Sequence, residues 1–260
     1  MRVLKGCRPV ATSIRLRLGA ALLAGMLLVS LSPSEAVAAI SLRASGIGTA
    51  ASATNTSVAS LAITRPAGVV TGDVMVAGIV VTDNGTAATV TSTGWTQILN
   101  TTSGTGHRLV TFYRVATGSE AASYTFALAS GTSVMAGGIV TYTGVATVNP
   151  INISGSGIGN SVPSITTTVA NTMLVSFLSE SGTTAMNPAT SMTERLEIGT
   201  TNTGFSAQVE SADQAQAAVG ATGAKTSTST TLNHICALAP PTATPTPTVT
   251  VTPTPTLTAT

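Results

Sequence analysis

One apolar run, Asp73 to Thr82 (DVMVAGIVVT), constrains the fold of this chain more than any other stretch. It is rich in β-branched and small residues and carries no charge after Asp73. Turn-forming sequences flank it, Arg65-Pro66-Ala67-Gly68 before it and Asp83-Asn84-Gly85 after it. An uncharged run of this length between turns predicts a strand buried on both faces, and not a helix. A two-layer β-sandwich can be built around such a strand.

Residues 1–39 have the features of a secretory signal peptide. The leader contains five basic residues: Arg2, Lys5, Arg8, Arg15 and Arg17. An apolar run from Leu18 to Leu31 follows, and Ala36-Val37-Ala38 has the small-x-small pattern that signal peptidase recognises. We expect cleavage after Ala38 or Ala39. The alternative is an uncleaved membrane anchor, but the run is shorter than the roughly 20 residues that a spanning helix needs. The expected location is therefore secreted, extracellular or at the cell surface.

The mature chain carries few charges. The leader holds five of the eleven basic residues and one of the nine acidic residues, Glu35, which leaves six basic and eight acidic residues. No basic stripe remains, so we expect no nucleic-acid partner. Cys7 lies in the leader and Cys236 is then the only cysteine, so no internal disulfide can form and the fold must depend on core burial. We expect no membrane span in the mature chain and no cofactor.

Short apolar runs recur between Gly, Asn and Ser clusters along residues 40–239, which is typical of an all-β extracellular module. The expected strands cover 40–45, 57–64, 73–82, 86–91, 94–99, 108–115, 123–129, 134–145, 165–169, 173–178, 193–198, 204–210 and 232–239. Together they predict one antiparallel two-sheet β-sandwich domain of jelly-roll type. Asn149-Pro150 marks a break between two halves. Residues 212–221 are Ala-rich and are compatible with one or two helical turns.

Two strands give more detailed predictions. The clearest period of two runs along 204–210, with Phe205, Ala207 and Val209 expected inward and Ser206, Gln208 and Glu210 expected outward. In the strand at 134–145, the paired glycines Gly137-Gly138 indicate either a bulge or a close backbone approach.

From residue 240 to 260 the chain is an uncharged Pro/Thr repeat. Such a segment favours extended polyproline-like conformations and cannot bury a core, so we interpret it as a semi-rigid linker or stalk. The alternative is a disordered tail. The expected organisation is a signal peptide at 1–39, a β-sandwich domain at 40–239 and a linker at 240–260.

Several phrases occur together in the domain: Pro66 to Asp73 before an apolar strand, Gly94-Trp95-Thr96, Phe112 to Glu120 (FYRVATGSE), Tyr124-Thr125-Phe126, Tyr142 to Val145 (YTGV), and Gly220 to Leu232. This series resembles a widespread, mostly uncharacterised group of secreted bacterial β-sandwich modules. Such modules occur beside other extracellular modules in surface, adhesive or polysaccharide-associated proteins. The resemblance spans about residues 42–239. It implies a fold and a location, and it brings no catalytic residues.

Aromatic residues are the first candidates for ligand binding. Trp95 is the only tryptophan, and an exposed Trp stacks well on the apolar face of a sugar ring. Tyr113 is a second candidate for such a platform. The alternative is that Trp95 opens a strand and fills the core, which the shortage of aromatic residues, 3% of the chain, favours. Tyr124 alternates with Phe126 and is expected in the core.

Catalysis and metal binding have weaker support. A glycosidase needs two carboxylates across a cleft, and Glu180 with Glu210 is the pair that the sequence offers, although nothing in their spacing demands it. A zinc site needs about four ligands, which His234 and Cys236 do not supply. Calcium at Asp83-Asn84-Gly85 is harder to exclude, but the turn is the preferred interpretation. We therefore predict no catalytic residue and no metal site.

The function predicted from these features is a secreted non-enzymatic module for adhesion or for binding a glycan or other cell-surface polymer. The first alternative is a structural subunit or spacer of an extracellular assembly, joined through an exposed edge strand such as 86–91. The second alternative is a glycoside hydrolase.

Overall fold

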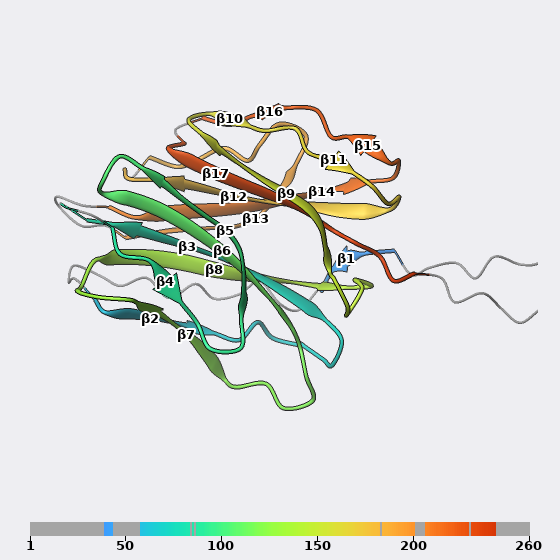
Figure 1. The fold of residues 1–260 in the computed structure, drawn as a ribbon, viewed down its shortest axis with the longest axis horizontal. Helices are drawn as coiled ribbons and strands as arrows, with labels where there is room; N and C mark the ends of the chain where they lie inside the picture. Colours follow the sequence, from blue (N-terminus) through green and yellow to red (C-terminus); the bar gives the residue numbers. More distant parts are fainter. Residues whose placement is uncertain are drawn as a thin grey trace, which may run out of the picture. The chain divides into compact units, whose positions relative to one another are not determined.

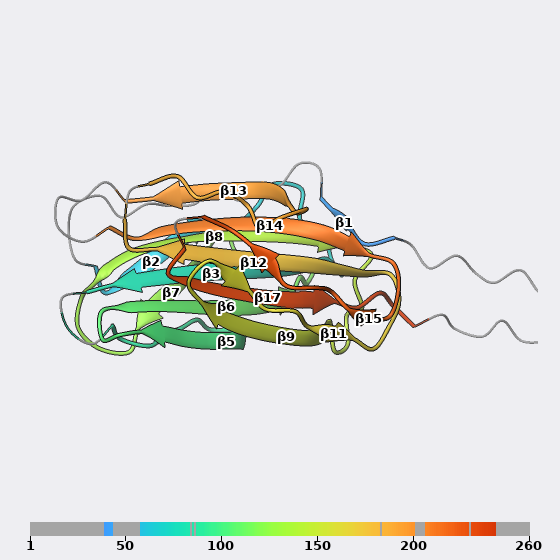
Figure 2. The ribbon, with the colours of Figure 1, turned by 90° about the horizontal axis from the view of Figure 1, so that it is seen from above.

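The computed structural model describes residues 39–43, 58–83, 85, 87–182, 184–200, 206–228 and 230–242, and the following description refers to these residues. Residues 1–38 of the expected signal peptide, Asn84, Thr86, Phe205 and the Pro/Thr repeat beyond residue 242 lie outside them. The described residues form strands, turns and connections but no helix, and hence no helix that is long and apolar enough to cross a membrane. Figures 1 and 2 show the strands stacked in layers.

Two five-stranded antiparallel sheets face each other at the centre. The first sheet has the order β1 (Ser41–Leu42), β8 (Val134–Thr143), β3 (Val74–Thr82), β6 (His107–Val115), β5 (Thr96–Ser103). The second sheet has the order β13 (Thr193–Gly199), β14 (Gln208–Gln216), β12 (Thr172–Glu180), β17 (Leu232–Leu238), β9 (Ile151–Ile158).

Each central sheet is covered on its outer face. The first cover is a small sheet of β2 (Ser60–Thr64), β7 (Ser123–Leu128) and β4 (Val90–Thr91). The second cover consists of β10 (Ser161–Val162) paired with β16 (Lys225–Thr226) and β11 (Thr166–Thr167) paired with β15 (Gly220–Ala221). The prediction of an all-β fold of antiparallel sheets is therefore confirmed, and the arrangement is consistent with a β-sandwich, although three smaller sheets accompany the two expected ones. A jelly-roll order is not confirmed, because each central sheet is built from one half of the chain.

Three hydrophobic cores hold these layers together. Val76 and Val80 of β3 point into the core between the two central sheets, together with Val175 and Phe177 of β12. Alternate residues of β3, such as Ile79, point into the core beneath the first cover. A third core lies beneath the second cover. All nine residues of β3 are buried, which confirms the prediction of a strand covered on both faces.

Polar side chains cross the central core in pairs. The His107 ring lies 3.2 Å from the Thr82 hydroxyl through Nδ1 and 3.0 Å from the Ser179 hydroxyl of the second sheet through Nε2. In the second sheet, the His234 ring lies 3.1 Å from the Thr111 hydroxyl through Nδ1 and 3.0 Å from the Thr101 hydroxyl through Nε2, and both threonines belong to the first sheet. Burial lowers the pKa of His107 to about 4 and that of His234 to about 3, so both rings are neutral at pH 7.

The predictions for individual strands were partly wrong. The Ala-rich stretch at 212–221 is not helical, because β14 continues to Gln216 along β12. Of the described residues 87–91 of the expected strand at 86–91, Val90–Thr91 form a strand, which is an edge of the first cover. At Gly137-Gly138 the ladder with β3 runs without a shift, so there is no bulge. Side chains approach these glycines closely instead, and an added Cβ would lie 2.5 Å from Ile79 or 2.7 Å from Leu196.

The alternation predicted along 204–210 was half right. Ala207 and Val209 are buried as expected. Ser206, Gln208 and Glu210, which were expected outward, are buried too. The reason is that the second sheet is covered on its outer face, so a period of two there separates two cores and does not separate core from solvent.

Acid is expected to weaken the sandwich through the two histidines. The unfolded chain takes up protons near pH 6.5, whereas the folded rings resist protonation until the pH is much lower. Their contribution to the free energy of unfolding should therefore be full above pH 6.5 and be lost as the pH falls toward 4, by on the order of 3 kcal/mol per ring. Urea unfolding between about pH 7 and pH 4 measures this contribution. The control is His107→Gln with His234→Gln, whose stability should fall less with acid than that of the unaltered chain; an equal fall would contradict the role of the rings.

Candidate functional site

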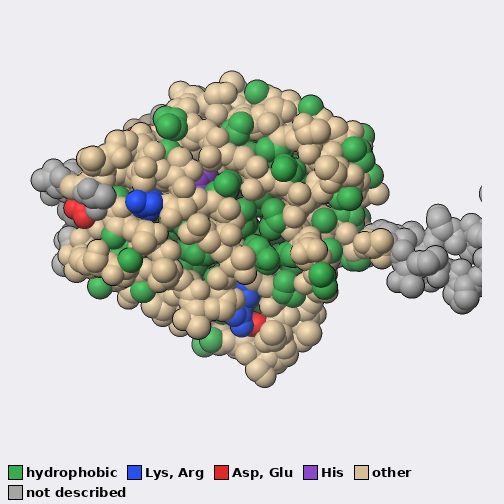
Figure 3. All heavy atoms as spheres, in the orientation of Figure 1, with side chains coloured by type: hydrophobic (Ala, Val, Ile, Leu, Met, Phe, Trp, Pro, Cys, Tyr) green, Lys and Arg blue, Asp and Glu red, His purple; other side chains and the backbone are tan. Residues whose placement is uncertain are grey.

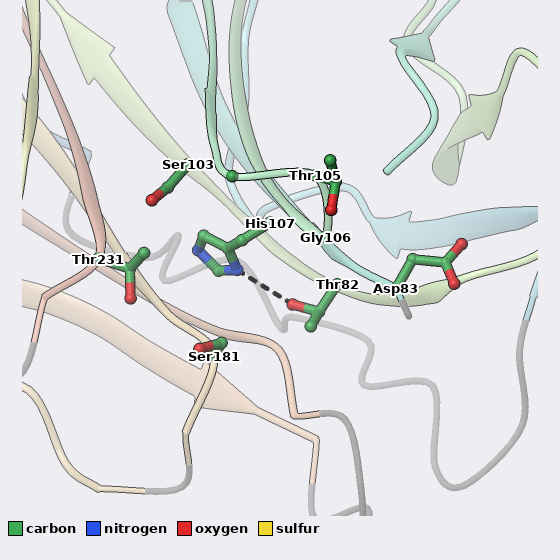
Figure 4. Close-up of a pocket in the computed structure, with 9 residues that line it drawn as sticks. Thr82, Asp83, Ser103, Thr105, Gly106, His107, Ser181 and Thr231 are labelled. Atoms are coloured by element: carbon green, nitrogen blue, oxygen red, sulfur yellow. Dashed lines mark hydrogen bonds between the residues drawn. The ribbon is translucent and has the colours of Figure 1, made fainter. Parts of the chain in front are cut away.

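A pocket of about 480 Å³ opens where β3 and β12 both end. Figure 4 shows hydroxyl side chains around a single imidazole ring, that of His107. The hydroxyl groups belong to Thr82, Ser103, Thr105, Ser181 and Thr231. The pocket draws its lining from the ends of strands in both central sheets and from the β5–β6 turn.

Backbone contacts between two turns shape one wall of the pocket. The amide of Asp83 donates to the carbonyl of Gly106 over 2.8 Å, and the amide of Ala87 donates to the carbonyl of Thr105 over 2.7 Å. The turns approach so closely that a Cβ at Gly106 would lie 2.3 Å from the Asp83 carbonyl oxygen. Glycine is therefore required at position 106 for the β5–β6 turn to form this wall.

His107 is placed to exchange hydrogen bonds and not to supply charge. Its two ring nitrogens face Thr82 and Ser179, and no carboxylate contacts either of them. Ser179 is buried, and its hydroxyl also lies 3.4 Å from the Leu232 carbonyl. A serine nucleophile needs an accessible hydroxyl, and the buried Ser179 does not supply one.

Among the described residues that line the pocket, Asp83 is the only charged one. The Ser133 hydroxyl donates to its Oδ2 over 2.8 Å, and in Figure 4 the carboxylate points away from His107. Chemically, the pocket offers hydroxyl donors and acceptors, a neutral ring and one carboxylate. It can hold a polar ligand by hydrogen bonds.

The structure does not bring the two predicted aromatic residues together. Trp95 is only 8% exposed and packs in the core beneath the first cover, with its ring 5.1 Å from that of Tyr124 at 83° and 5.4 Å from that of Phe126. A ring packed in this way presents no free face to a sugar. Tyr113 is half-buried and belongs to the other face of the first sheet, the face that carries Thr111. Neither residue lines the pocket, so position lends their predicted ligand role no support.

A second polar cluster braces the first cover. Arg114 donates to Glu120 over 2.8 Å, Tyr124 donates to it over 2.7 Å, and the backbone amide of Thr117 over 2.7 Å. Burial acts to raise the pKa of Glu120, but hydrogen bonds from Arg114, Thr117 and Tyr124 outweigh it and lower the pKa to about 2. All the charges in this cluster are paired, so we interpret the cluster as stabilising the first cover and not as a binding site. Its Glu120 and Tyr124 belong to the phrases that carry the resemblance.

The two acids proposed for a glycosidase do not share an open cleft. Glu180 accepts a hydrogen bond from Thr231 over 3.1 Å at the end of β12. Glu210 is fully buried, and neither of its carboxylate oxygens has a hydrogen-bond partner. Burial, with smaller contributions from Glu194 and Glu197, raises the pKa of Glu210 to about 8. A glycosidase acid must reach its substrate, and Glu210 in this position does not.

Among the described residues, no group of three or more His, Cys, Asp and Glu side chains is placed to hold a metal ion. The pocket itself was missed by sequence reasoning, which looked for aromatic platforms. The available signal was the polar turn of residues 103–106, which leads directly into His107 at the start of a buried strand.

Neither protein-family models, nor curated proteins, nor solved structures gave a match to this chain. The resemblance to secreted bacterial modules therefore stays a prediction.

Replacing Trp95 with Ala should lower the free energy of unfolding, whether or not a ligand is present. Removing a large buried ring leaves a cavity and typically costs about 3–5 kcal/mol. Thermal and urea unfolding measure the loss. The control is Val148→Ala, because Val148 is 77% exposed and its truncation should change stability very little. A fully stable Trp95→Ala protein would show that the ring is not part of the core.

Replacing Glu210 with Gln should stabilise the protein in alkali. The folded pKa of about 8 lies above the ordinary value of 4.5, so the folded state keeps a proton that the unfolded state releases. Stability should therefore fall as pH rises from 4.5 to 8, and Glu210→Gln should remove this fall, a gain on the order of 4 kcal/mol above pH 8 and little at pH 4. Urea unfolding at both pH values tests this. Glu194→Gln, at an exposed position of β13, is the matched control and should give a much smaller gain, because Glu194 contributes less than burial does to the raised pKa of Glu210. Equal effects of the two variants would contradict the prediction.

Proposed function

We propose that this chain is a secreted, non-catalytic β-sandwich module that binds a glycan or other cell-surface polymer in the pocket at the ends of β3 and β12. The observation that carries the proposal is the lining of that pocket: five hydroxyl side chains, one neutral imidazole and one carboxylate. Hydroxyl-rich ligands are recognised by such mixed donors and acceptors, because each sugar hydroxyl both donates and accepts.

The low charge of the chain supports an uncharged ligand. Charged residues make up 8% of the sequence, and the face seen in Figure 3 carries few of them among many other polar and apolar groups. A surface of this kind gives little electrostatic steering toward ionic partners. Export through cleavage after Ala38 or Ala39, and display on the Pro/Thr segment, belong to the same proposal.

One observation favours a structural role as the second candidate. β9 is an edge strand of the second sheet, has eight residues and no charge, and exposes Ile158 to 67%. Apolar side chains gather over this part of the face in Figure 3. An uncharged edge with free backbone groups can pair with a strand of another molecule. A species that stays monomeric at high concentration would count against this candidate.

Pocket variants test the binding role. Isothermal titration against a panel of soluble polysaccharides should find a ligand for the mature chain. Asp83→Asn should then weaken binding by about tenfold or more, since hydrogen bonds to a charged group are the stronger ones, and Thr105→Val with Ser181→Ala should weaken it by a similar factor. Thr125→Val is the control, because Thr125 is an exposed threonine on the first cover, away from the pocket. Binding that survives all the pocket variants would place the ligand elsewhere.

A further inference from the structure

The two central sheets have the same strand order when strands are counted within each half of the chain. In the first half, β1, β3, β5, β6 and β8 form the order β1-β8-β3-β6-β5. In the second half, β9, β12, β13, β14 and β17 form the order β9-β17-β12-β14-β13. The counterparts are β1 and β9, β8 and β17, β3 and β12, β6 and β14, and β5 and β13. Replacing each strand of the first sheet by its counterpart gives the order of the second sheet. The matching positions below follow from this correspondence.

The registers match as well as the order. Val76 of β3 pairs with Tyr113 and Val140 on its two sides, and Val175 of β12 pairs with Asp213 and Cys236 in the same way. Both edge ladders are also interrupted at the same place. The shift between Gln97 and Leu99 in β5 corresponds to the shift between Glu194 and Leu196 in β13. A bulge adds one residue at a chosen position, so a shared bulge is a specific likeness.

The turns before matching strands have the same backbone conformation. Gly72 precedes β3 with φ 88°, and Asn171 stands at the matching position before β12 with φ 57°. The turn before β5 closes with the Trp95 amide donating to the Ser92 carbonyl, and the turn before β13 closes with the Met192 amide donating to the Ala189 carbonyl. Gly94 and Ser191, each just before the closing residue, both have positive φ. Positive φ is uncommon outside glycine, so its recurrence at Asn171 and Ser191 is informative.

The covers correspond too. β2 and β7 form one antiparallel ladder, and they lie in the chain between β1 and β3 and between β6 and β8. The second cover occupies the same places between β9 and β12 and between β14 and β17. Its two short ladders keep one register, with Ser161 opposite Thr226 and Thr167 opposite Gly220. It is therefore a single interrupted ladder, equivalent to the β2–β7 ladder of the first cover.

The two halves face each other as the halves of a twofold dimer do. Gly78 and Phe177 occupy matching positions and touch each other, since a Cβ at Gly78 would lie 2.1 Å from the Phe177 ring. Residues that touch their own counterparts lie on a twofold axis. Contacts away from it are reciprocal: β8 packs on β13 and β14, and its counterpart β17 packs on β5 and β6. Thr82 and its counterpart Ser181 meet at the pocket, so the axis leads into it.

We infer that this chain is a fused dimer, in which residues 41–143 and 151–238 are two copies of one fold unit. The inner face of each central sheet is an association surface, and the partner that it fits is a second copy of the same unit. In this chain the connection at 144–150 makes that partner part of the same polypeptide. The inference does not depend on the proposed glycan binding.

A circular permutant of the mature chain tests the inference. The permutant starts at Asn149 and runs to Ala239. A copy of residues 144–148 then connects Ala239 to Ile40. From Ile40 the chain runs to Val148, and residues 240–260 follow. Leu42 then follows Ala239 at the same spacing at which Ile151 follows Thr143. Under twofold symmetry, the new junction after Ala239 is equivalent to the natural junction after Thr143. The same short connection must therefore be long enough at both. A matched control permutant has the same new junction but is opened between Ala217 and Ala218, inside the second unit.

The expected result is a monomer by size exclusion, with a urea midpoint within about 0.5 M of that of the parent and above that of the control permutant. A second version of the permutant carries a flexible connection of twice the length. Folding with the long connection only, or intertwined dimers with the short one, would show that the junctions are not equivalent and would overturn the inference. Failure of both versions would overturn it as well, because equivalent units tolerate either order. Glycan binding is not used as a readout, so the outcome is separate from that of the proposed function.

Discussion

The contact between the Phe177 ring and Gly78 is the constraint on which the sandwich depends. Glycine leaves room for the ring between the two central sheets, and a side chain at position 78 would collide with it. The aliphatic residues around this contact complete a core that is buried from both sides. The core contributes the main favourable free energy, since Cys236, the only cysteine among the described residues, is free and forms no disulfide.

Several polar groups in this interface have hydrogen-bond partners in the facing sheet. The Tyr142 hydroxyl donates to Asp213 over 2.9 Å, and Arg195 donates to the same carboxylate over 2.7 Å. The two buried histidines are likewise held between hydroxyl groups. Such pairs add little net stability, but losing one member leaves the other buried without a partner, which is costly. They therefore favour one alignment of the sheets over others. Glu210, on the outer face of the second sheet, has no hydrogen-bond partner, and a proton offsets its burial.

The class of fold could be predicted from the sequence, and the site could not. The run at β3 is uncharged and bounded by turns, so its burial followed from composition alone. Residues such as Glu210 and Gln208 were misplaced because alternation separates two faces without telling what covers each of them. The pocket depends on Thr82 and Ser181, which lie far apart in the chain and meet only through the packing of the two sheets. Local sequence patterns do not predict contacts between residues that are so far apart in the chain.

The position of Trp95 has a practical consequence for spectroscopy. It is the only indole in the chain, and its counterpart in the second half is Met192. Both side chains fill the core beneath a cover, so they occupy equivalent environments. Intrinsic emission therefore reports on the N-terminal half alone, and far-ultraviolet dichroism reports on both. Any difference between the two signals during denaturation would reveal whether one half loosens before the other.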